Sequence, residues 1–243
     1  MANPHTAFLT VSIIFTVIAS GPKQCVSTKT FTLVNYCDET IWPGITHGEN
    51  FGSGGFTLKP GQSAVYPASD GWNGRIWART GCNFDKKGSG CKCKTGDCGS
   101  SINCTGPGSP PATIAEFTLG ALDYYDVSLV DGFNLPIAVQ AFNGTGNCSS
   151  AGCDGDLRQS CPSQLAMKDG DKVIACQSAC SVFNTDEYCC RGMHADPITC
   201  LPSNYAKGFK QVCPAAYSFA FDDPTSIITC TGASFAVIFC ASR

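Results

Sequence analysis

Carboxyl side chains on predicted strands are the residues of this sequence that could do chemistry. Glu116 is the only charged residue in the apolar alternation 115–119, where its neighbours share the opposite face. Asp126 lies on a second predicted strand, and Asp131 follows five residues later. Strict alternation would separate the two aspartates, but Gly132 allows the strand to end and Asp131 to turn. Glycoside hydrolysis requires such a set, with one carboxyl protonated and another ionised.

Two further charged residues could join these carboxyls. Arg75 shares one face of a predicted strand with Trp77 and Arg79, and Asp223 lies in a loop beside a proline. Clustered carboxyls repel, so at least one pKa should rise, whereas an arginine lowers the pKa of its nearest carboxyl partner. The sequence therefore allows one site to hold carboxyls of different pKa.

Each of these residues also has a purely structural interpretation. Glu116 and Arg75 could form a structural ion pair on neighbouring strands, and Asp131 could belong to a simple turn. Trp77, between two arginines, is better explained by packing in a cation–π ladder than by ligand contact. We interpret Asp97, inside a cysteine-rich block, as a turn residue.

The composition excludes several other classes of protein. The chain of 243 residues has a net charge of −3 and therefore no basic surplus for nucleic acid. No Gly-x-Ser-x-Gly elbow and no phosphate-binding loop occurs. The three histidines do not cluster, so we expect no metal and no cofactor. A zinc site among Cys91–Cys104 is the weaker alternative to disulfides there.

The cysteines and the N-terminus indicate an oxidising compartment. Cysteine accounts for 18 residues, close to the share typical of a disulfide scaffold. Residues 7–19 form an apolar run that suits a signal peptide and is too short to span a membrane. Cleavage could follow Ala19 or Ser27; we prefer Ser27, which makes residues 1–27 the signal peptide. We expect a secreted, extracellular (apoplastic) protein, with Asn143 the best of three glycosylation sequons because it lacks a neighbouring cysteine.

Many short strands separated by turns predict a mainly β fold, a sandwich or barrel. The segment 234–240 is apolar on both faces and should be a central strand. Two cysteine-rich segments, 82–112 and 148–213, interrupt the pattern. In the second, Ser203 is a predicted helix N-cap. The other predicted strands are 30–37, two short strands within 56–66, 75–80, 114–119, 124–130 and 135–139.

Five sequence blocks resemble the thaumatin-like protein family. They are Gly74–Cys82, Cys93–Cys98 with Cys104, Val130–Asn134, Tyr188–Cys190 and Asp222–Ser226. The resemblance covers residues 28–243 and implies a flattened antiparallel β-sandwich with two disulfide-rich excursions. The sandwich core would be 28–81, 113–147 and 214–243, and the excursions 82–112 and 148–213. Ser89, Cys91 and Ser100 depart from the family pattern, which affects the expected loop shape there.

The resemblance also implies eight disulfides. They would join Cys37 to Cys240, Cys82 to Cys93, Cys98 to Cys104, Cys148 to Cys230, Cys153 to Cys213, Cys161 to Cys176, Cys180 to Cys189, and Cys190 to Cys200. Cys25 and Cys91 have no family partner. Cleavage after Ser27 would leave Cys91 as an odd thiol or a competitor for Cys82, whereas cleavage after Ala19 would allow a ninth bridge between Cys25 and Cys91.

By the same resemblance, an acidic cleft would carry the function. Its five family positions match Arg75, Glu116, Asp126, Asp131 and Asp223. The implied protein is a secreted plant defence (antifungal) protein that recognises fungal cell-wall β-1,3-glucan and could also meet fungal membranes or wall proteins. One alternative is a weak endo-β-1,3-glucanase with Glu116 as acid and Asp131 as base or nucleophile, and another is a non-catalytic protein-interaction or enzyme-inhibitor role. We expect a monomer. Tyr125, Phe133 and Tyr217 are candidate stacking faces for sugars.

Overall fold

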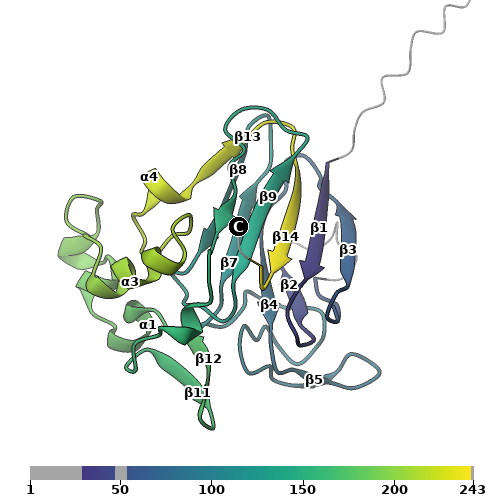
Figure 1. The fold of residues 1–243 in the computed structure, drawn as a ribbon, viewed down its shortest axis with the longest axis horizontal. Helices are drawn as coiled ribbons and strands as arrows, with labels where there is room; N and C mark the ends of the chain where they lie inside the picture. Colours follow the sequence, from purple (N-terminus) through teal and green to yellow (C-terminus); the bar gives the residue numbers. More distant parts are fainter. Residues whose placement is uncertain (1–28, 47–53, 242–243) are drawn as a thin grey trace, which may run out of the picture.

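The computed structural model describes residues 29–46 and 54–241, and the predicted signal peptide with Cys25 lies outside them. Two five-stranded sheets enclose the main core (Figure 1). The first has the order β10-β9-β14-β1-β3, and the second has the order β13-β8-β7-β4-β2. The fold is mainly β, as the sequence predicts.

The strands of the first sheet come from the beginning, the middle and the end of the described chain. They are β1 (Thr30–Asn35), β3 (Ser63–Pro67), β9 (Ile137–Phe142), β10 (Ala151–Gly152) and β14 (Ser234–Phe239). β14 is the central strand, as its apolar sequence predicts. It runs parallel to β1, with Phe31 opposite Phe235, whereas the other strand pairs of the two sheets are antiparallel.

The second sheet carries the predicted chemistry. Its strands are β2 (Trp42–Ile45), β4 (Asn73–Arg79), β7 (Ile114–Thr118), β8 (Asp123–Ser128) and β13 (Ile228–Cys230). Its inner face packs on the first sheet through aromatic rings: the ring centroids of Phe31 and Phe117 are 4.8 Å apart, and those of Tyr125 and Phe235 are 5.1 Å apart. The inner face is therefore filled with side chains, and only the outer face is available for a site.

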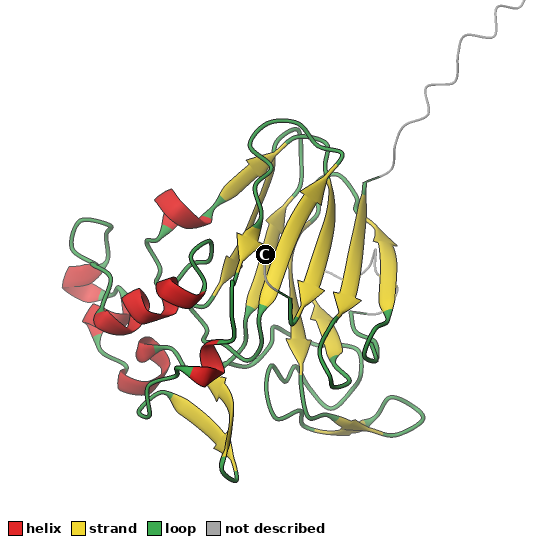
Figure 2. Ribbon diagram, in the orientation of Figure 1, coloured by secondary structure: helices red, strands yellow, loops and turns green. Residues whose placement is uncertain are grey.

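The two cysteine-rich segments lie on opposite sides of the second sheet in the view of Figure 1. The small one contains the hairpin β5 (Asn83–Phe84) and β6 (Gly90–Cys91). The large one contains the hairpin β11 (Ala166–Asp169) and β12 (Lys172–Cys176) and the helices α1 (Ala179–Phe183), α2 (Asp186–Cys189) and α3 (Asn204–Val212) (Figure 2). Beyond it, α4 (Asp223–Ser226) leads into β13. Ser203 caps α3 as predicted, since its side chain accepts a hydrogen bond from the Ala206 amide.

Among the described residues, eight disulfides join the pairs that the resemblance implies. The Cys37–Cys240 bridge joins the segments that follow β1 and β14, and Cys148–Cys230 ties β13 to the segment before β10. Cys82 pairs with Cys93, so the alternative in which Cys91 takes the place of Cys93 is wrong. Cys25 and the Cys91 side chain lie outside the described part of the structure, so the odd thiol and the ninth bridge stay predictions. Between residues 29 and 241, leaving out 47–53, no helix combines the length and apolarity that crossing a membrane requires.

Candidate functional site

A row of charged side chains crosses the outer face of the second sheet. Arg75 on β4 is directly opposite Glu116 on β7, and Glu116 is directly opposite Asp126 on β8. Directly opposed residues of an antiparallel pair project on the same face, with their Cβ atoms about 5 Å apart. Three residues far apart in sequence thus become consecutive neighbours, because the register of three strands aligns them.

This row forms the floor of a cleft of about 700 Å³. The cleft is lined by all five residues of the predicted acidic site, namely Arg75, Glu116, Asp126, Asp131 and Asp223. Its lining also includes Tyr124 and Tyr217, and the segment around Ala220 with α4 contributes to its wall. The cleft therefore lies between the sheet and the chain that returns from the large cysteine-rich segment.

A tight turn brings Asp131 to the same cleft as Asp126. β8 ends at Ser128, two residues earlier than the sequence predicts, and the Gly132 amide donates a hydrogen bond to the Leu129 carbonyl at 2.9 Å. Gly132 has φ of 90°, and a Cβ there would lie 2.8 Å from the Cys176 carbonyl oxygen. Only glycine fits this position easily, so the turn interrupts the alternation that would have sent Asp131 to the opposite face.

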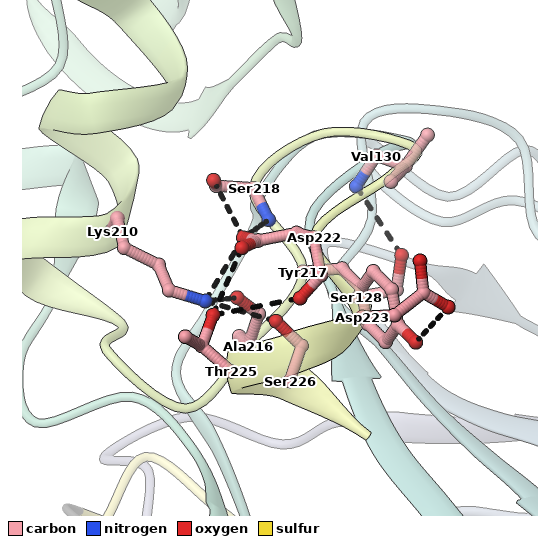
Figure 3. Close-up of polar contacts among 10 residues, drawn as sticks. All are labelled: Ser128, Val130, Lys210, Ala216, Tyr217, Ser218, Asp222, Asp223, Thr225 and Ser226. Atoms are coloured by element: carbon pink, nitrogen blue, oxygen red, sulfur yellow. Dashed lines mark hydrogen bonds and ion pairs between the residues drawn. The ribbon is translucent and has the colours of Figure 1, made fainter. Parts of the chain in front are cut away.

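A buried polar network fixes the wall that carries Asp223 (Figure 3). The Lys210 Nζ of α3 donates to the Ala216 carbonyl, Asp222 Oδ2 and Ser226 Oγ, each at 2.9 Å. Asp222 also accepts hydrogen bonds from the amide and hydroxyl of Ser218 and from the Thr225 hydroxyl. Three acceptors use all the donor capacity of an ammonium group, so Lys210 joins α3, the 216–222 loop and α4 into one unit.

At the edge of this unit the Tyr217 hydroxyl donates to Asp223 Oδ1 at 3.1 Å (Figure 3). Asp223 is exposed, and it opens the short helix α4. Burial, followed by the hydrogen bond to Asp223, raises the pKa of Tyr217 above its ordinary value. Tyr217 therefore stays a neutral donor in the cleft over the physiological range.

Glu116 is held by an ion pair and partly dehydrated. Its Oε1 is 2.7 Å from Arg75 Nε. Burial raises its pKa, the charge and hydrogen bond of Arg75 lower it, and the Asp131 charge raises it, with a net increase. Glu116 and Arg75 thus form the ion pair between neighbouring strands that the structural interpretation predicts. Both residues also line the cleft.

Asp126 is in a different situation from Glu116. Its Oδ1 is enclosed and has no hydrogen-bond partner. Burial, followed by the Glu116 charge, raises the pKa of Asp126; Arg75 lowers it and Asp223 raises it, and the net value is about 8. The Glu116 carboxyl therefore has an arginine partner, whereas the Asp126 carboxyl opposite it has no cationic partner.

Of the three aromatic residues predicted to stack on sugars, only Tyr217 lines the cleft. Tyr125 and Phe133 are fully buried, so the prediction that they offer stacking faces to sugars is wrong. Tyr125 points inward because it alternates with Asp126, and its ring packs against Phe235. Tyr217 does line the cleft, as does the exposed Tyr124, which the sequence analysis missed although it shares a face with Asp126.

Trp77 and Arg79 lie outside the cleft although they share the Arg75 face of β4. Both are fully buried. Trp77 Nε1 donates to the Gly96 carbonyl at 2.8 Å, and the Arg79 guanidinium lies 5.3 Å from the centre of the Phe84 ring. Trp77 is thus a packed residue and does not contact a ligand in the cleft.

Asp97 has the local role expected of it, since its Oδ1 accepts a hydrogen bond from the Cys93 amide. In the part of the chain that the structure describes, no three His, Cys, Asp or Glu side chains gather in an arrangement that could hold a metal ion.

Comparisons with known proteins agree with this fold. The model of the thaumatin family matches residues 35–241. Pathogenesis-related thaumatin-like protein 3.5 of Cryptomeria japonica is 50% identical and covers 100% of both chains. Pathogenesis-related protein 5 of Arabidopsis thaliana is 49% identical over 95% of this chain and 97% of its own.

Two further similarities concern β-1,3-glucan enzymes. A glucan endo-1,3-beta-glucosidase of Prunus avium is 41% identical over 97% of this chain and 98% of its own. The crystal structure of a laminaripentaose-producing β-1,3-glucanase from Paenibacillus barengoltzii covers 92% of this chain and 78% of its own, with a TM-score of 0.57 and 14% identity. At that identity the similarity establishes a shared fold only.

Proposed function

This chain belongs to the thaumatin family, and we propose that it is a secreted defence (antifungal) protein that recognises fungal cell-wall β-1,3-glucan in its acidic cleft. The observation that carries the proposal is the convergence of five charged side chains and two tyrosines on one open cleft. The family and its pathogenesis-related relatives support a role in defence. The glucan endo-1,3-beta-glucosidase among the relatives supports the choice of ligand.

The chemistry of the cleft suits a neutral polyhydroxyl chain. Carboxylate oxygens accept hydrogen bonds from sugar hydroxyls, and Tyr217 and Arg75 provide donors. The exposed ring of Tyr124 offers an apolar face on which a pyranose ring can stack. A cleft of about 700 Å³ lies within the range of ligand-binding sites.

Calorimetric titration with a linear β-1,3-linked glucose hexamer tests the proposal. We expect the wild type to bind it and to reject the β-1,4-linked hexamer. Tyr124→Ala should weaken binding about tenfold, the order of magnitude of a lost aromatic contact. Tyr36→Ala is the matched control, since Tyr36 is exposed but lines a different depression. Absence of binding, or equal losses in the two variants, would contradict glucan recognition and favour a protein-interaction role.

A weak endo-β-1,3-glucanase is the second candidate. The Prunus avium relative favours it, as does the raised pKa of Glu116, which helps a carboxyl to act as an acid. In this proposal Glu116 protonates the leaving oxygen and Asp131 is the base or nucleophile. Release of reducing ends from linear β-1,3-glucan should be measurable for the wild type and lost in Glu116→Gln. Binding without release in the wild type would exclude the enzyme.

Extracellular localisation and glycosylation belong to the same proposal. The eight disulfides and the pathogenesis-related relatives are consistent with a secreted protein. Asn143 is exposed directly after β9, which favours it as a glycan acceptor. Mass spectrometry of the protein secreted from plant cells would identify both the mature N-terminus and any glycan on Asn143.

A further inference from the structure

Asp126 has an electrostatic environment unlike that of its neighbours in the cleft. The Glu116 carboxyl is paired with Arg75, and the Asp223 carboxyl accepts from Tyr217. Asp126 Oδ1 is enclosed by protein and has no partner. An enclosed carboxylate oxygen without a hydrogen bond is costly in the charged form and much less so in the neutral form.

The groups that face Asp126 also favour the neutral form. Glu116 faces it from β7 and Asp223 from α4 with negative charge, Asp131 adds charge beside Glu116, and Tyr217 faces it from the preceding loop as a neutral group. Arg75 on β4 is the cation of this group, and its Nε is already used by Glu116. The negative groups near Asp126 therefore outnumber the positive one.

A neutral carboxyl would complete the hydrogen-bonding capacity of the cleft. Ionised carboxylates only accept hydrogen bonds, whereas every sugar hydroxyl has a donor and an acceptor side. Of the donors Tyr217 and Arg75, the Tyr217 hydroxyl is directed at Asp223 and Arg75 Nε at Glu116, which leaves the remaining guanidinium N–H groups of Arg75. A protonated Asp126 supplies a donor that these contacts do not use.

We propose that Asp126 takes part in glucan recognition as a neutral carboxylic acid that donates its proton in a hydrogen bond to an oxygen of the bound sugar. The enclosed Oδ1 then has the carbonyl role, which tolerates the missing donor, and the other oxygen carries the proton. This inference rests on the glucan recognition proposed above and adds that glucan binding requires this proton. The raised pKa of Asp126, about 8, is consistent with the geometry.

The test measures affinity for the β-1,3-linked glucose hexamer between pH 5 and pH 9. Because only the protonated form binds, the affinity should be constant at low pH and fall at least about tenfold between pH 6 and pH 9. Titrations in buffers with different ionisation enthalpies should show uptake of about one proton per hexamer bound at pH 9 and close to none at pH 6. The second measurement uses the wild type alone, so it does not depend on any variant folding.

Variants identify the group. Asp126→Asn keeps the shape, supplies an amide donor and cannot ionise, so it should bind with the same affinity at pH 6 and pH 9. Asp38→Asn removes an exposed carboxyl outside the cleft and should keep the wild-type profile.

Wild-type binding that is equal at both pH values, or a pH dependence that persists in Asp126→Asn, would overturn the inference and leave glucan recognition standing. No binding at any pH would overturn glucan recognition itself and this inference with it.

Discussion

Two arginines on one face of β4 end in opposite environments. Arg79 is fully buried, and it donates to the carbonyls of Trp42, Pro43, Ser101 and Ile102 at 2.6–3.3 Å. The Arg75 side chain, four residues earlier, is 45% exposed and pairs with Glu116 in the cleft. The same strand face is thus a packing surface at one end and a binding surface at the other.

The difference comes from what covers the sheet. The small cysteine-rich segment folds over the far end of β4, where Trp77 clusters with Cys98, Ala112 and Ile114. Gly108 approaches so closely that a Cβ there would lie 2.4 Å from Trp77 Nε1. At the Arg75 end the segment around Ala220 and α4 borders the sheet and leaves the cleft between them. Alternation assigns a residue to a face, and the covering segment decides what that face does.

Burial without a directly bonded carboxylate changes the chemistry of Arg79. Desolvation lowers its pKa to about 10, partly offset by the Asp97 charge, so the guanidinium stays charged at neutral pH. Carbonyl dipoles stabilise that charge in place of water. Arg79 therefore serves the stability of the covered end, whereas Arg75 serves the electrostatics of the open end.

The largest expected effect comes from removing the buried arginine. Arg79→Met leaves four carbonyls without their donor, and we expect a loss of at least about 3 kcal/mol in the free energy of unfolding. Arg75→Met is the matched control and should cost less than about 1 kcal/mol, as for a solvated pair. Denaturant unfolding with the disulfides intact measures both. Arg79→Lys keeps the charge, so its loss of unfolding free energy should lie between those of Arg79→Met and Arg75→Met. Similar losses in Arg75→Met and Arg79→Met would contradict the difference between the two ends of β4.

The next effect concerns the wall of the open end. Lys210→Met removes the donor to Asp222 and Ser226 and leaves the Asp222 charge without its cation. We therefore expect a loss of about 2–3 kcal/mol in the free energy of unfolding. Hydrogen exchange should rise in residues 216–226, which carry Tyr217 and Asp223. Lys207→Met on the exposed side of α3 is the control and should change neither quantity. Unchanged exchange in Lys210→Met would mean that the wall is held by other contacts.

A pH-dependent effect follows from Asp126. Its folded-state pKa of about 8 is above the ordinary value of 3.8, so the folded protein retains a proton that the unfolded chain releases. The free energy of unfolding should therefore decrease as pH rises from about 4 to about 8. Asp126→Asn should abolish that decrease and be more stable than the wild type at pH 9, whereas Asp38→Asn should follow the wild type. Parallel curves for all three proteins would contradict the assignment.

The smallest expected effect is on Glu116. Removing Arg75 takes away the charge that lowers the Glu116 pKa, so the titration midpoint of Glu116 should rise in Arg75→Met. Carbon NMR of the Glu116 carboxyl follows the titration. Arg158→Met removes an arginine that pairs with Asp156 outside the cleft and should leave the midpoint in place. A midpoint that does not move would show that the ion pair contributes little in solution.

Local patterns predicted the regular elements where one signal dominated. The apolar run of β14 indicated a central strand, and Ser203 before an amphipathic segment indicated α3. β2 was not predicted, and it contains Pro43 and Gly44, which are unfavourable in strands; it is an edge strand, where the missing amide of proline is tolerated. The β11–β12 hairpin was missed because it lies in the large cysteine-rich segment, which the sequence analysis interpreted as loops and a helix.

The sequence by itself determined which side chains share a strand face, and its family resemblance named the five cleft residues and the eight cysteine pairs. Only the tertiary structure decided that Arg75, Glu116 and Asp126 stand in one row, because register joins residues that are 41 and 10 positions apart. It also decided that Arg79 is enclosed and that Asp126 lacks a partner. Burial and hydrogen-bond partners depend on which segments come to cover a face, and alternation within a strand carries no information about that cover.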